Sequence, residues 1–230
     1  MNGALTANIA AAGRIAGVVA PVCAAAAASL VALTAPVESV RSAHAAMSIT
    51  APNANHQVGM YGDPAAAAPF WRLQHSSDCG EMAVADVVGQ ITGREPTERQ
   101  ITSLAENTPS ITGAGPIYHR RGGTDISNLP VLLAHYGIQS SLGQPTIGRL
   151  EQDLAQRHTV IVAVNAETIW NTPGNRKVDN HVVVVTGVDT KAGVVHLNDS
   201  GIRSGRNEQI SLTTFEKAWA TSHDLAVVTT

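Results

Sequence analysis

Four residue types in this sequence could together carry out acyl transfer. They are a cysteine, a histidine, an aspartate and a glutamine, namely Cys79, His181, Asp199 and Gln74. A thiolate attacks a carbonyl carbon, an imidazole moves the proton, a carboxylate orients the ring, and an amide N–H stabilises the oxyanion that develops. Because these residue types occur in most proteins, the elements that hold them must be considered next.

Cys79 stands where a helix is expected to begin. Ser77 or Asp78 can cap that helix, and Glu81 is favourable near its positive end. Gly93 is typical of a helix end. Apolar residues recur between these points at helical spacing, at Met82, Ala85, Val88 and Ile91. A helix N-terminus stabilises a thiolate, so the position favours a nucleophile over the alternative of an inert, buried cysteine.

His181 and Asp199 lie on two predicted strands of one hairpin. His181 opens the β-branched run HVVVVTGVD (181–189), and the run GVVHLND (193–199) ends at Asp199. The pairing brings Asp199 close enough to hydrogen-bond the imidazole and fix its tautomer. Asn198 or Asp189 could hold the ring instead, and a histidine at a strand edge can also be only a satisfied polar residue.

Gln74 lies five residues before Cys79, in a predicted loop. Its side-chain amide can donate to an oxyanion together with the backbone N–H of Cys79. The alternative is an ordinary loop amide.

The pattern along the chain predicts an α+β fold. Helices come first, with the candidate nucleophile at a helix start, and they pack on a mostly antiparallel sheet. Further helices are expected at 97–107, 125–136, 146–156 and 213–220, and further strands at 159–165 and 225–230. The folded domain is expected over 69–230, preceded by a linker at 47–68 that is rich in Ala, Pro, Gly and Asn.

The first 46 residues have the parts of a signal peptide. Arg14 precedes an uncharged apolar stretch (15–37), and Ala43-His44-Ala45 fits the small-x-small cleavage pattern. We expect export with cleavage near Ala45, which leaves Cys79 as the one cysteine of the mature chain. A retained membrane anchor and an Ala-rich tail are the alternatives.

Composition excludes several other functions. The net charge is −3 and there is no basic patch, so nucleic acid is not an expected partner. No His, Asp or Glu cluster has metal-ligand spacing, and one mature cysteine excludes a zinc site made of several cysteines. The glycines in RRGGT (120–124) lack the Lys-Ser/Thr of a phosphate loop. We therefore expect neither a metal nor another cofactor.

The motifs QHSSDCG, RRGGTDISNLPVLLAHYGI, NHVVVVTGVD, VHLNDSG and LTTFEKAW stand in the order found in stand-alone C39-like peptidases. From Gln74 to Trp219 the chain resembles this group of the papain-like (CA-type) superfamily. The resemblance implies a papain-like fold. Its motifs assign the oxyanion donor, nucleophile, base and orienting acid to Gln74, Cys79, His181 and Asp199. One departure is CGEMA (79–83), where bacteriocin-maturing relatives of the resembled group often have a small residue or proline in place of Glu81. That glutamate can either alter substrate approach or stabilise the helix.

The resemblance implies amide-bond hydrolysis. Together with the expected signal peptide, it predicts an exported peptidase that acts on a peptide or protein substrate. No transporter module is expected in this chain, so the double-glycine leader cleavage of transporter-linked relatives does not carry over. Two alternatives remain. One is an amidase or transpeptidase acting on cell-wall peptides, and the other is a catalytically silent module that keeps the fold and binds peptides.

Overall fold

The computed structural model of the protein describes residues 59–120 and 122–230. The expected signal peptide and residues 47–58 of the expected linker lie outside this part of the chain. The described helices are α1 (Pro64–Ala67), α2 (Cys79–Thr92), α3 (Glu98–Glu106), α4 (Leu129–His135), α5 (Ile147–Ala155), α6 (Ala166–Ile169) and α7 (Leu212–Trp219), with 3-10 turns η1 (Ala68–Phe70), η2 (Ile126–Asn128) and η3 (Ala220–Ser222). Within the described ranges, no helix combines the length and apolar character needed to cross a bilayer.

One antiparallel sheet holds the described domain together. Its strands are β1 (Met60–Gly62), β2 (Ser140–Gly143), β3 (Val160–Val164), β4 (His181–Asp189), β5 (Val194–Asn198), β6 (Glu208–Ser211) and β7 (Ala226–Thr229). The order is β2-β7-β3-β4-β5-β6, and β1 pairs with the far end of β4. The predicted α+β class, with helices packed on a mostly antiparallel sheet, is confirmed.

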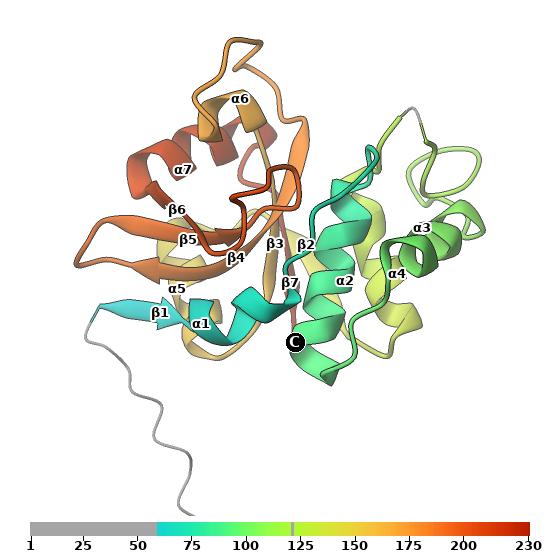
Figure 1. Cartoon of the computed structure of the whole chain (residues 1–230), viewed down its shortest axis with the longest axis horizontal. Helices are drawn as coiled ribbons and strands as arrows, with labels where there is room; N and C mark the ends of the chain where they lie inside the picture. Colours follow the sequence, from blue (N-terminus) through green and yellow to red (C-terminus); the bar gives the residue numbers. More distant parts are fainter. Residues whose placement is uncertain (1–58, 121) are drawn as a thin grey trace, which may run out of the picture. The chain divides into compact units, whose positions relative to one another are not determined.

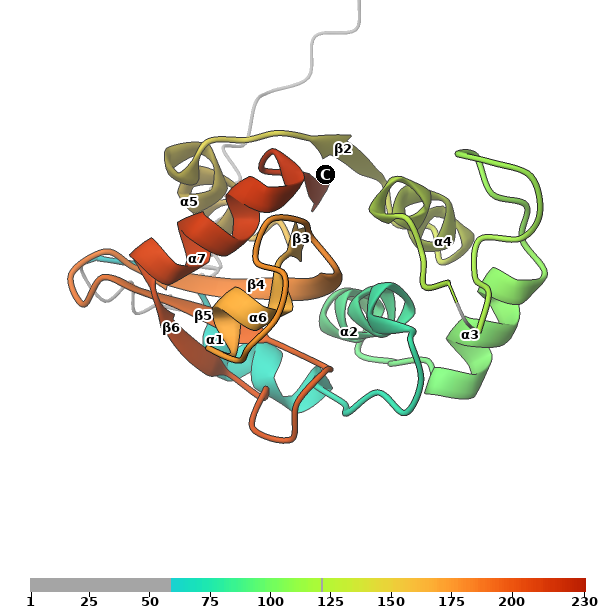
Figure 2. The same ribbon diagram turned by 90° about the horizontal axis from the view of Figure 1, so that it is seen from above.

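Helices cover both faces of this sheet. Helices α2, α3 and α4 lie on one side, and α5, α6 and α7 lie on the other (Figures 1 and 2). The sequence of β3 explains how one sheet packs against helices on both of its faces. Ile161 and Ala163 belong to the core under α2, whereas Val160, Val162 and Val164 belong to the core under α5 and α7. Alternate side chains of a strand point to opposite faces, so a continuous apolar run suits a strand buried on both.

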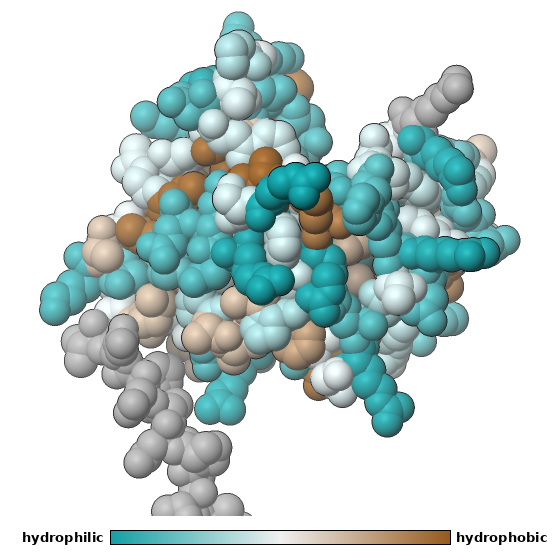
Figure 3. Space-filling view, in the orientation of Figure 1, coloured by the Kyte–Doolittle hydropathy of each residue, from teal (hydrophilic) through white to brown (hydrophobic). Residues whose placement is uncertain are grey.

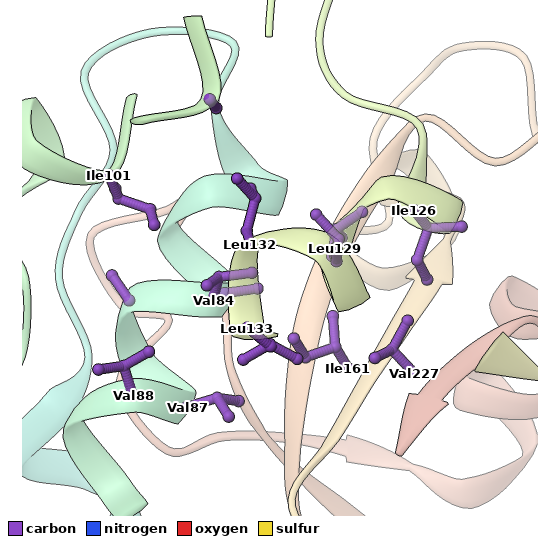
Figure 4. Close-up of a cluster of buried hydrophobic side chains, with 14 of the residues drawn as sticks. Val84, Val87, Val88, Ile101, Ile126, Leu129, Leu132, Leu133, Ile161 and Val227 are labelled. Carbon is purple, nitrogen blue, oxygen red and sulfur yellow. The ribbon is translucent and has the colours of Figure 1, made fainter. Parts of the chain in front are cut away.

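The core on the α2 side is built from aliphatic side chains of helices and strands. Figure 4 shows Val84 and Val88 of α2, Leu129 and Leu133 of α4, and Ile161 of β3 converging in it. Each of these side chains is at most 2% exposed. Burial on this scale is worth roughly 1.5–3 kcal/mol for each large aliphatic side chain, so this core fixes α2 against the sheet.

Most predicted elements are found within one or two residues of their expected bounds. The expected helix at 97–107 is α3, which Thr97 begins with a capping box to Gln100. The helix expected over 125–136 is instead the turn η2 followed by α4. Pro130 explains the break, because proline has no N–H to donate and is tolerated only in the first turn of a helix.

The expected linker at 47–68 is wrong for the residues that the structure describes there. Met60 pairs with Asp189 in β1, and α1 follows at once. Gly62 has φ +87°, and a Cβ at this position would collide with the carbonyl oxygen of Thr186. Gly62, one of the residues that led us to expect a linker here, is therefore required for the backbone of β1 to approach β4 closely.

Candidate active site

The first turn of α2 carries Cys79. Asp78 occupies the N-cap, the helix begins at Cys79, and Gly93 ends it with φ +71°. The thiol is partly buried and is a free cysteine. Four N–H groups at a helix start have no partner within the helix, and together with the helix dipole they favour a negative charge on the sulfur.

His181 and Asp199 form a buried pair at the end of β4 that lies beside α2. His181 is the first residue of β4 and is held by its pairing with Val164 of β3. Asp199 directly follows β5 and is completely buried. The distance from His181 Nε2 to Asp199 Oδ1 is 2.7 Å. Because this bond occupies Nε2, the other ring nitrogen, Nδ1, is the one left for Cys79.

The other two candidate partners of the histidine are engaged elsewhere. Asn198 donates from Nδ2 to Ala67 O and Asp86 Oδ2, at 3.0 and 2.8 Å. The Asp189 carboxylate accepts from the backbone N–H groups of Lys191 and Ala192, at 3.0 and 2.9 Å, and so closes the β4–β5 turn. Among the three residues considered from sequence, Asp199 is thus the one bonded to the ring.

Two further groups hold Asp199, and sequence reasoning missed both. Trp170 donates its indole N–H to Oδ2 at 2.8 Å, and the backbone N–H of Gly201 donates to Oδ1 at 2.7 Å. The Trp170 ring also lies against the His181 ring, with centroids 5.1 Å apart. A Cβ on Gly201 would lie 2.7 Å from the Trp170 ring, so this packing requires glycine. A tryptophan and a glycine carry no motif of their own, so no sequence signal pointed to them.

The charges of the pair follow from these contacts. Burial lowers the pKa of His181, but hydrogen bonds and charges from Asp199 and Cys79 raise it to about 10. Burial raises the pKa of Asp199, and its bonds to His181, Trp170 and Gly201 more than offset this, so the pKa is lowered. At neutral pH the pair is therefore an imidazolium and a carboxylate, with Cys79 near enough to the ring to favour its charged form.

Gln74 lies next to this pair and is bound to Ser200, the residue after Asp199. Its Oε1 accepts from Ser200 Oγ at 2.8 Å, and its backbone N–H donates to Ser200 O at 2.9 Å. Its Nε2 donates to Ser76 O at 2.8 Å. A side-chain amide has two N–H groups, and the hydrogen bonds of the described residues use one of them.

Two more carboxyl groups are buried beside Cys79. Glu81, in the first turn of α2, accepts from Thr124 Oγ1 through Oε1, and its Oε2 accepts no hydrogen bond within the described residues. Burial raises its pKa to about 7. Asp78 does not cap α2 with its side chain, and burial followed by the proximity of Glu98 raises its pKa to about 6, although Ser76 lowers it. Glu81 is completely buried and is bonded to Thr124, so its side chain is not exposed to solvent.

A groove of about 570 Å³ lies beside the loop that carries Gln74. It is lined by Phe70, Arg72, Leu73, His75, Met82, Gly93, Glu95, Pro96, Thr97 and Glu98. Figure 3 shows the face seen in Figure 1 as mostly hydrophilic, with hydrophobic residues in a row over β6 and α7 and in a smaller group beside α2. No group of three or more His, Cys, Asp or Glu side chains within 59–120 and 122–230 is arranged to hold a metal ion.

A helix-start cysteine packed against an antiparallel sheet, with a histidine and a carboxylate at the ends of two neighbouring inner strands, is the arrangement of a papain-like fold. The described fold is similar to a solved structure from Bacillus anthracis described as a C39-like peptidase. The TM-score is 0.56 at 17% identity, and the match covers 74% of this chain and 97% of that one. At this identity the likeness is one of fold.

The sequence comparisons give the family. The profile of the Peptidase_C39 like family matches residues 67–227, and this chain belongs to that family. Uncharacterized proteins of Mycobacterium tuberculosis and Mycobacterium bovis are each 49% identical over 197 aligned positions, which cover 74% of this chain and 84% of the relative. The predicted C39-like family is confirmed.

Proposed function

We propose that this protein is a cysteine peptidase that hydrolyses peptide bonds through an acyl-enzyme on Cys79. One observation carries the proposal. The His181 ring is bonded through Nε2 to Asp199 at 2.7 Å, and Cys79 stands near enough to the ring to help raise its pKa. This is the order of groups that activates a thiol nucleophile. Membership of a C39-like peptidase family supports the same reaction.

The reaction follows from the charges of the pair. The Cys79 thiolate attacks the amide carbonyl carbon, and the carbonyl oxygen becomes an oxyanion that accepts from Gln74 Nε2 and the Cys79 backbone N–H. His181 gives its Nδ1 proton to the leaving amine as the C–N bond breaks, which leaves a thioester. The neutral imidazole then takes a proton from water. The resulting hydroxide attacks the thioester, which releases the carboxylic acid and restores the thiolate and imidazolium.

The first test is the rate of iodoacetamide alkylation of Cys79 between pH 4 and pH 9. An ordinary thiol is less than about 1% thiolate at pH 6, so rapid alkylation there indicates a thiolate held by an imidazolium. We expect that reactivity in the wild type and its loss in His181→Ala. Ordinary thiol behaviour in both proteins would favour a silent peptide-binding module instead.

The second test is hydrolysis of a peptide library, read by mass spectrometry, with Cys79→Ser as the control. New N-termini that form only with the wild type support the peptidase. A panel of cell-wall peptides and amine acceptors belongs in the same experiment, because cleavage or amide exchange confined to that panel would assign the amidase or transpeptidase alternative. A trapped thioester in either panel would identify Cys79 as the acylated residue.

We also propose that the protein is exported and cleaved near Ala45. The support is the sequence of residues 1–46, which lie outside the described residues. The N-terminus of the protein recovered from culture medium and from washed membranes tests this. A medium form that begins just after Ala45 agrees with cleavage, whereas an intact N-terminus in the membrane fraction favours the anchor.

A further inference from the structure

Another carboxyl group, only partly buried, stands behind the His181–Asp199 pair. Glu208 begins β6, where it pairs with Leu197 of β5, two residues before Asp199. The next residue, Gln209, is exposed, so the alternation of the strand turns Glu208 inward. Leu197 and Asp199 are two residues apart and share one face, so Glu208 and Asp199 are diagonal neighbours across the two chain segments, and Glu208 Oε2 is buried without a hydrogen bond from the described residues.

Two carboxyl groups can form a hydrogen bond with each other only if one of them carries a proton. Asp199 Oδ1 already accepts from His181 and Gly201, and Oδ2 accepts from Trp170. These donors stabilise the charged form of Asp199, so the proton belongs to Glu208. Oδ2 has one lone pair left over to receive it.

The titratable groups that face Glu208 are Asp199, after β5, and His181, on β4. Burial, followed by the charge of Asp199, raises the pKa of Glu208 to about 7, although the His181 charge lowers it. Below this pH the carboxyl is neutral and is a donor. Above it, a second negative charge stands beside Asp199.

We infer that Glu208 is a positioning residue, whose neutral carboxyl donates a hydrogen bond to Asp199 and so fixes the carboxylate that orients His181. It touches neither the thiol nor the substrate. The inference rests on the proposed peptidase activity for its effect on rate, but the hydrogen bond itself does not depend on any substrate.

The bond is tested first without substrate, by following the side-chain carboxyl carbon of Glu208 in ¹³C-glutamate-labelled protein by NMR from pH 4 to 9. We expect Glu208 to titrate near pH 7 in the wild type and at lower pH in Asp199→Asn, since that change removes the neighbouring charge. Titration of Glu208 near its ordinary pH in the wild type, or an unchanged midpoint in Asp199→Asn, would overturn the inference whether or not the protein is a peptidase.

The effect on rate is tested with Glu208→Leu, which cannot donate, and Glu208→Gln, which donates at every pH. Misplaced catalytic groups cost up to about 100-fold, so we expect Glu208→Leu to lower kcat/KM by roughly 10- to 100-fold. Glu208→Gln should restore most of that loss and lack the change in rate near pH 7. The matched control is Gln209→Leu, on the exposed side of the same strand. Equal losses in the two Glu208 variants, or none in Glu208→Leu, would overturn the inference.

Discussion

The carboxyl groups on the two sides of Cys79 are buried in opposite ways. On the sheet side, Asp199 accepts three hydrogen bonds and its pKa is lowered. On the helix side, Glu81 accepts one, its second oxygen has no donor in the described structure, and its pKa rises to about 7. Burial alone therefore does not set the charge of a carboxyl group. The hydrogen-bond donors and the charges beside it do, and Asp199 has the positive charge of His181 where Glu81 has no such charge within the described residues.

This contrast assigns the two sides different roles. A carboxylate fixed by three donors has one orientation, which suits a group that must hold an imidazolium. A carboxyl group with an unsatisfied oxygen is costly when charged and is more stable when neutral. The sheet side is thus expected to control reactivity, and the helix side is expected to control stability and its dependence on pH.

The largest expected effect is on the sheet side. Asp199→Asn keeps the shape but replaces the carboxylate with a neutral amide, and the tautomer of His181 is no longer fixed. We expect kcat/KM for peptide hydrolysis to fall by roughly 10³- to 10⁴-fold, as in other triads. Steady-state kinetics on the best library peptide measure this, with circular dichroism to confirm folding. A loss of less than tenfold would contradict the conclusion that the sheet side controls reactivity.

The next effect is on stability at the helix side. Glu81 has its pKa raised above its ordinary value of 4.5, so the folded protein binds this proton more tightly than the unfolded chain. Its contribution to the free energy of unfolding therefore declines as pH rises from about 4.5 to about 7. Glu81→Gln removes the charge and keeps the acceptor for Thr124. We expect this variant to be more stable than the wild type at pH 8, on the order of 1–3 kcal/mol, with little difference at pH 4.

Urea unfolding of both proteins at pH 4, 6 and 8 measures that difference. Both proteins contain His181, so its contribution cancels in the difference between them. The raised pKa of His181 stabilises the folded state below about pH 6.5, and this stabilisation is lost as pH rises through about 10. A Glu81→Gln protein that is less stable at pH 8 would show that the Glu81 carboxylate has partners not accounted for.

A smaller effect is expected from the indole that holds Asp199. Trp170→Phe keeps most of the packing against His181 and removes the donor to Oδ2. The loss of one charge-assisted hydrogen bond is worth about 1.5–3 kcal/mol if the acceptor is left unpaired. Because Asp199 keeps two donors, we expect only about a tenfold fall in kcat/KM. Rates equal to those of the wild type would mean that His181 and Gly201 suffice to hold Asp199.

The smallest effect is expected at the N-cap. The pKa of Asp78 is about 6, so its carboxylate is charged at pH 8 and stands next to Cys79 in the chain. Asp78→Asn removes this charge and keeps the side-chain shape. Because burial makes the charged form of Asp78 costly in the folded protein, we expect the variant to be more stable than the wild type at pH 8, by roughly 1 kcal/mol or less, with little difference at pH 4. Urea unfolding at the two pH values measures this, and a variant that is less stable at pH 8 would contradict the cost assigned to the Asp78 carboxylate.

Much of the fold and part of the site could be predicted because their signals are local. The cap and apolar spacing around Cys79 predicted a helix that begins there, and α2 begins at Cys79. The β-branched run at 181–189 predicted β4 with the same bounds. The short edge strands β2 and β6 and the four-residue helix α6 were not predicted, since few residues and a partly polar pattern give no clear period.

Other features depend on contacts that no local pattern records. The sequence favoured Asp199 as the partner of His181 and kept Asn198 and Asp189 as alternatives. The contacts formed around the β4–β5 register, with Val184 opposite Asn198, decided among the three. The bond from Trp170 to Asp199 joins residues 29 apart in the chain. Likewise β1 forms only because Gly62 can approach β4. The sequence by itself determined where the helix and strands begin. The tertiary structure decided which donors reach each buried carboxyl group, because hydrogen bonds between distant residues depend on the register and packing of the whole sheet.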